Sequence, residues 1–122
     1  MLREIRTAGA QVPAMVEQAM TRCAREYGAA YLLPHGSDAE QAHRAEQLAA
    51  VCERRARWWG VLLAWAFTPI CDLPWVFGAA LIDARRHEQS AARFWREVAA
   101  DAHARHATRV VGSFATAKRT AS

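Results

Sequence analysis

One stretch of 25 residues between Arg57 and Asp83 constrains the fold of this chain more than any other feature. It holds four of the five tryptophans, two of the four prolines and a single charged side chain, Asp72. Apolar residues at helical spacing lead into the stretch and out of it, and Pro69 and Pro74 interrupt it. Because proline breaks or kinks a helix, the stretch is predicted to form the turn of an antiparallel helical hairpin.

The composition favours an all-α fold. The 122 residues include 28 alanines and 15 arginines but only six glycines and four prolines. Alanine and arginine are strong helix formers, and the apolar residues do not alternate as strands require. At this length the chain has room for a single domain with one core. The net charge of +4 is mild, and most arginines lie near a Glu or Asp in the sequence, which is typical of a solvated helix surface.

Local signals divide the chain into three helices. A capping box formed by Ser37 and Glu40 starts the second helix, and Thr68 ends it, because Pro69 disfavours a helical residue before it. Pro13 fits either the first residue of a helix or a kink in a longer one. We expect a weakly defined segment at 1–12, helices at 13–33, 37–68 and 73–111, and a frayed tail at 112–122.

The second and third helices each carry an apolar seam with alternating steps of four and three residues, the spacing of helices that pack along their length. In the second helix the seam positions are Ala45, Ala49, Cys52, Ala56, Trp59, Leu63 and Ala66. Asp72 is the predicted N-cap of the third helix. The seam positions there are Phe77, Leu81, Ala84, Glu88, Ala91, Trp95, Val98 and Ala102.

The hairpin turn sets which seam residues face each other. Trp59 is expected opposite Ala84, so that a large residue meets a small one. Glu88, the only charged seam residue, falls opposite Arg54 and Arg55, and a carboxylate on a seam needs such a partner. Apolar side chains off the two seams need a third surface, which the 13–33 helix supplies. We therefore predict a three-helix bundle built on a long antiparallel hairpin.

The tip of the hairpin carries more aromatic side chains than the first helix is expected to cover, and an uncovered patch of this kind marks an interface. We expect contacts with a partner through Trp58, Trp65, Ile70, Trp75 and Phe77. Around them we expect a charged rim of Arg54, Arg55, Arg85 and Arg86. Aromatic anchors inside a polar border are the usual anatomy of a binding hot spot. The expected partner is another protein, a second copy of this chain, or both.

Two other kinds of partner are compatible with the same stretch. Residues 63–82 have the length of a membrane span, but the central Asp72 and two prolines oppose a full crossing. A tip that dips into one leaflet, as a peripheral membrane hairpin, fits them better. The arginines around the tip could instead contact the phosphates of a nucleic acid, although the helices are too long for a helix-turn-helix.

Motifs for catalysis and metal binding are weak. Glu40 and His43 have the spacing of metal ligands in helical bundles, and His103 and His106 would lie opposite them. In the predicted register, however, His43 points away from the partner helix. The sequence has no nucleophile elbow, Gly-rich phosphate loop or paired catalytic carboxylates. We expect no enzyme activity, metal or cofactor. The three cysteines lack a C-x-x-C motif and are expected to be reduced thiols packed as small apolar residues in a cytoplasmic protein.

The sequence therefore predicts a small non-catalytic helical protein that acts by binding another macromolecule and that self-associates. A peripheral membrane hairpin and a nucleic-acid-binding protein are the alternatives. Size, composition and the lack of catalytic motifs also suit a bacterial, phage or mobile-element accessory or inhibitor protein.

Overall fold

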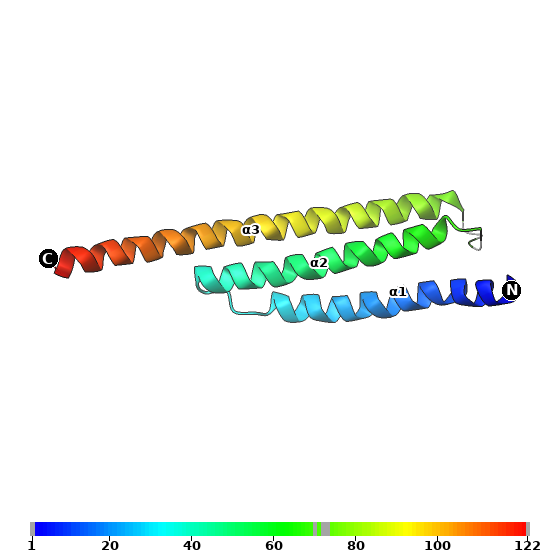
Figure 1. The fold of residues 1–122 in the computed structure, drawn as a ribbon, viewed down its shortest axis with the longest axis horizontal. Coiled ribbons are helices and arrows are strands. Elements are labelled where there is room, and N and C mark those ends of the chain that lie inside the picture. The colour runs from blue at the N-terminus through cyan, green and yellow to red at the C-terminus, as the bar shows by residue number, and fades with distance from the viewer. Residues whose placement is uncertain (1, 70, 72–73, 122) are drawn as a thin grey trace.

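Three antiparallel helices lie side by side, with the second helix between the other two (Figure 1). The computed structural model describes residues 2–69, 71 and 74–121, and for residues 2–10 the backbone only. The helices are α1 (Leu2–Tyr31), α2 (Asp38–Ala66) and α3 (Trp75–Ala121), and the described residues contain no strand. The predicted all-α, three-helix fold is confirmed. Helix α2 packs against both neighbours, whereas the described parts of α1 and α3 do not pack against each other.

Helix α1 is one continuous element that includes Pro13. The sequence predicted a helix from residue 13 and a weakly defined segment before it, whereas the structure starts the helix at Leu2. Proline removes one backbone hydrogen bond from a helix interior but does not have to end the helix. The face of α1 that meets α2 buries Val16, Ala19, Cys23 and Ala30, as expected of a helix that supplies the third surface of the bundle.

The connection from α1 to α2 contains the predicted capping box. The Ser37 hydroxyl accepts a hydrogen bond from the Glu40 amide at 3.1 Å, and the Glu40 carboxylate accepts one from the Ser37 amide at 3.1 Å. This reciprocal pair satisfies two amides at the start of α2. The prediction of the capping box is confirmed.

The core is narrow and consists mostly of alanines and other small residues. On α2 the predicted seam residues Ala45, Ala49, Cys52 and Ala56 are buried, as are Leu48 and Val51 beside them. On α3 the buried seam positions are Glu88 and Ala102, while Ala92 and Ala99 lie one position beyond the predicted 91 and 98. The contact face of α3 is therefore rotated slightly from the predicted one. Small side chains on both helices allow the backbones of α2 and α3 to pack closely.

One ion pair between α2 and α3 agrees with the predicted register of the hairpin. Arg55 Nε lies 3.5 Å from Glu88 Oε1, as expected from the placement of Glu88 opposite Arg54 and Arg55. Glu88 is only 8% exposed. Arg54 turns to the other side and forms its ion pair with Glu26 of α1. The carboxylate partners of the two neighbouring arginines thus lie on different helices.

Two arginines of α2 reach both outer helices. The Arg44 guanidinium lies over the Tyr31 ring of α1 at 4.5 Å and near the Trp95 ring of α3 at 5.6 Å. Arg55 contacts the Tyr27 ring of α1 at 5.3 Å as well as Glu88 of α3. Positions 44 and 55 are 11 residues apart and share one face of α2. Cation–π and ionic contacts on this face therefore connect α1 to α3, which do not pack directly.

The hairpin turn follows Ala66, near the predicted end of the second helix. The Thr68 hydroxyl donates to the Trp65 carbonyl at 2.6 Å, and the Phe67 ring lies over Gly78 of α3, where a β-carbon would come within 3.5 Å of the ring. The Phe67 ring thus lies against the start of α3 at an ordinary contact distance. The predicted N-cap Asp72 lies outside the described residues.

Helix α3 continues far past the other two helices (Figure 1). The sequence predicted its end near residue 111 and a frayed tail at 112–122, whereas the structure extends the helix to Ala121. Gly112 has an ordinary negative φ, so it does not act as the left-handed helix terminator that glycine often supplies. Alanine, arginine and lysine, which favour helices, are frequent in this segment.

Within the part of the chain that the structure describes, no helix combines the length and the hydropathy needed to cross a bilayer. The 63–82 window that raised this question is divided between the end of α2, the turn and the start of α3.

We expect Glu88→Ala to lower the free energy of unfolding by about 1–3 kcal/mol, because Arg55 then remains partly buried without its carboxylate. Combining it with Arg55→Leu removes the unpaired charge and should restore most of the loss. Urea denaturation followed by circular dichroism measures both. A Glu88→Ala protein as stable as the wild type would show that the ion pair does not hold the hairpin together.

Candidate functional site

Large apolar side chains are exposed where α2 ends and α3 begins. We call this surface the aromatic end; it consists of Val61, Phe67, Trp75, Val76 and Phe77. Phe67 is 73% exposed and Trp75 85% exposed. Phe67 and the first turns of α3 lie on the same tip, as the contact of the Phe67 ring with Gly78 shows. Exposed aromatic residues gathered in this way are uncommon on surfaces that face only water.

The predicted interface residues differ in how far they are exposed. Trp75 and Phe77 are exposed, whereas Trp58 and Trp65 are partly buried. Ile70 lies outside the described residues. Sequence reasoning did not include Val61 and Val76 in the tip, because their exposure depends on the rotation of each helix about its axis.

The predicted charged rim is also divided. Arg54 and Arg55 form ion pairs with Glu26 and Glu88 inside the three-helix assembly. Arg85 packs over Gly60 of α2, where a β-carbon would lie 3.6 Å from the guanidinium. Arg86 is exposed. The four arginines therefore do not surround the tip as one group.

A groove of 660 Å³ runs between α2 and α3. Its lining contains four arginines, two glutamates, one glutamine and two alanines: Arg57, Arg85, Arg93, Arg96, Glu53, Glu97, Gln89, Ala56 and Ala92. Arg93 and Arg96 were not among the predicted site residues. The spacing of Arg85, Gln89, Arg93 and Arg96 along one helix face was the available signal.

One ion pair closes part of this groove. Arg96 donates to both carboxylate oxygens of Glu53, with Nε at 2.9 Å and Nη2 at 3.1 Å. This hydrogen bonding lowers the pKa of Glu53 below its ordinary value and raises the pKa of Arg96. Glu53 is thus ionised at neutral pH and occupies one of the four guanidinium groups.

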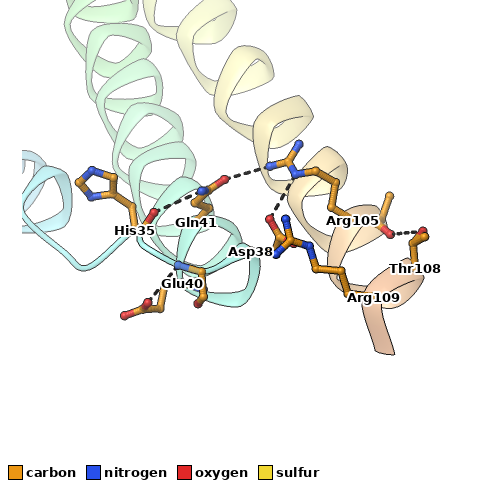
Figure 2. Close-up of polar contacts among 9 residues, drawn as sticks. His35, Asp38, Glu40, Gln41, Arg105, Thr108 and Arg109 are labelled. Atoms are coloured by element: carbon orange, nitrogen blue, oxygen red, sulfur yellow. Dashed lines mark hydrogen bonds and ion pairs between the residues drawn. The ribbon is translucent and has the colours of Figure 1, made fainter. Parts of the chain in front are cut away.

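The opposite end of the hairpin carries a polar cluster around Asp38 (Figure 2). Asp38, in the first turn of α2, is 7% exposed. Arg105 donates to its Oδ1 at 3.3 Å, and Arg109 Nε lies 2.8 Å from its Oδ2 in an ionic contact. Arg105 also donates to Gln41, which in turn donates to the His35 carbonyl. The cluster fixes α3 at the point where it leaves the other helices.

Beyond this cluster, α3 exposes Val110, Val111 and Phe114. These residues fell at or after the predicted helix end, so sequence reasoning assigned them no surface. No acidic residue follows Asp101 in the sequence.

The three cysteines are free thiols, with Cys23 and Cys52 buried and Cys71 partly exposed. Burial, and secondarily the nearby Glu88 carboxylate, raise the pKa of the Cys52 thiol. A raised pKa keeps the thiol protonated and unreactive at neutral pH.

The histidines considered as metal ligands have other surroundings. His103 contacts the Glu46 carboxylate across the helix pair, and His43 and His106 are exposed. Among the described residues, no group of three or more His, Cys, Asp or Glu side chains is placed to hold a metal ion.

Comparison with protein-family models, curated proteins and solved structures finds no significant match to this chain.

We expect Asp38→Asn to lower the free energy of unfolding by about 1–2 kcal/mol, because a nearly buried carboxylate with two arginine partners loses its charge. The partly exposed arginines keep the effect modest. Hydrogen exchange should become faster in residues 103–110 of α3. Asp101→Asn, an exposed change on the same helix, serves as the control. Equal exchange in both variants would contradict an anchoring role of Asp38.

We expect a thiol reagent at neutral pH to modify Cys71 at least roughly tenfold faster than Cys52, since burial and the raised pKa protect Cys52. Mass spectrometry of peptides after short labelling times measures the order. In denaturant the difference should vanish. Fast labelling of Cys52 in the folded protein would show that the contact between α2 and α3 opens readily.

Proposed function

We propose that this protein is a non-catalytic helical module that binds another protein through its aromatic end, and that the first such partner is a second copy of the chain. The observation that supports this most is the exposure of Trp75, Phe67 and Phe77 at one tip of the hairpin. Tryptophan and phenylalanine contribute large apolar area when buried, so leaving them in water is unfavourable.

The character of the aromatic end agrees with a protein partner. Its apolar side chains come from the last turns of α2, the connection after it and the first turns of α3, and the Phe67 ring lies close to Gly78. Aromatic anchors on a preformed surface lose little conformational freedom on binding. Such residues are the usual hot spots of protein interfaces.

A second copy is the simplest partner for this surface. An isologous contact places the same patch of each copy against the other. An apolar tip suits such a contact, because no charges of like sign must be brought together at its centre. The proposal includes a cytoplasmic location, which agrees with the free thiols.

Light scattering after size-exclusion chromatography tests the proposal in buffer without detergent. We expect the wild-type protein to form a dimer or larger assembly. Trp75→Ser combined with Phe77→Ser should give a monomer with unchanged helix content, because both side chains are exposed and support little of the fold.

The matched control is Leu32→Ser. Leu32 is 83% exposed, nearly the same as Trp75, but lies in the connection at the other end of α2. This variant should assemble like the wild type. A wild-type monomer across the accessible concentration range would contradict self-association through the aromatic end. Aggregation cured only by detergent, with binding to lipid vesicles lost in the double variant, would replace the protein partner with a membrane surface.

A further inference from the structure

The groove between α2 and α3 lies on the face of the molecule turned away from the arginine bridges to α1. Arg57 follows Arg55 by two residues, about 200° around the helix. Arg55 reaches Tyr27 and Glu88 on one face, whereas Arg57 lines the groove on the other. Every residue that lines the groove belongs to α2 or α3, so α1 leaves it open.

The groove holds more positive charge than its own carboxylates neutralise. Its lining has four arginines and two glutamates. Glu53 is engaged by Arg96. In the described part of the chain, Arg57, Arg85 and Arg93 form no ion pair with a carboxylate. Arg93 donates one hydrogen bond to Ser90 of its own helix, which leaves its other N–H groups for a ligand.

The positive charges form a row and do not converge on one point. Arg85, Arg93 and Arg96 lie along 11 residues of α3, which is about 16 Å at a rise of 1.5 Å per residue. Arg57 faces them from α2. A single small anion would contact only part of this row, whereas an extended polyanion would meet all of it.

The chemistry of the lining points to phosphate. A guanidinium presents a planar fork of donors that matches a phosphate bidentately, and Gln89 adds a neutral amide between Arg85 and Arg93. The buried Ala56 and Ala92 also line the groove, and none of the described residues in its lining carries an aromatic ring. Nucleic-acid bases would find no ring to stack on, so contact would be confined to the sugar-phosphate strand.

We propose that the groove lined by Arg57, Arg85, Arg93 and Arg96 binds the phosphate backbone of a nucleic acid without reading its sequence. This site is separate from the aromatic end and does not depend on the proposed self-association. The site differs from the predicted charged rim, because Arg54 and Arg55 are committed to ion pairs with Glu26 and Glu88.

Fluorescence anisotropy with labelled single-stranded and duplex oligonucleotides of mixed sequence tests the proposal. The wild-type protein should bind, with affinity falling steeply between about 50 and 200 mM salt. Arg85→Gln combined with Arg93→Gln should weaken binding at least about tenfold at the lower salt. The slope of log affinity against log salt should fall by roughly 1.4 for a single strand, since two phosphate contacts are lost.

The matched control is Arg22→Gln combined with Arg25→Gln on α1, which removes the same charge from exposed positions outside the groove. It should keep the wild-type affinity within about twofold to threefold and nearly the same salt slope. Equal losses in both double variants would overturn the proposal, because binding would then follow net charge alone. Absence of wild-type binding at about 50 mM salt, or binding only to anionic lipid vesicles, would also overturn it.

Discussion

The fold depends on a central helix that must hold two neighbours that do not hold each other. Helix α2 meets α3 through a seam of alanines and Cys52, which brings the two backbones close but contributes little apolar area per residue. Long side chains at the edges of the seam supply the remaining contacts. Arg44 and Arg55 are the main examples, because each touches an aromatic ring of α1 and a side chain of α3. Because the sequence is rich in alanine, the apolar core is narrow. Charged and cation–π contacts along its border therefore supply part of the contact between the helices.

Side-chain spacing made the hairpin predictable. Heptad-like steps locate the faces of α2 and α3, and the prolines at 69 and 74 locate the turn, so the placement of Glu88 opposite Arg54 and Arg55 followed without further information. The Ser37–Glu40 capping box was predictable for a similar reason, because it is a local interaction with a fixed spacing. Interactions that depend on periodicity or on residues close in the sequence can therefore be predicted without knowing how the helices pack.

The surfaces were harder to predict, because exposure depends on small rotations of packed helices. A shift of one position on α3 buries Ala92 and Ala99 in place of the predicted 91 and 98, and the same shift determines that Arg93 and Arg96 line a groove. Arg54 and Arg55 were grouped as one rim because they are adjacent in sequence, yet 100° of helix rotation separates them and their carboxylate partners lie on different helices. The end of α3 was missed because the segment after residue 111 was expected to fray, whereas the backbone at Gly112 and beyond remains helical.

The two proposed surfaces are compatible within one molecule. Arg57 in the groove and Val61 in the aromatic end are separated by four residues and lie on the same side of α2, so the groove begins next to the tip. A contact between the tips of two copies buries the ends of the hairpins and leaves their flanks in solvent. The groove on each copy would then remain open, with its row of guanidinium groups running away from the shared tip. Self-association would thus bring two phosphate-binding grooves into one particle, which increases the effective affinity for a long polyanion without adding a contact to either groove.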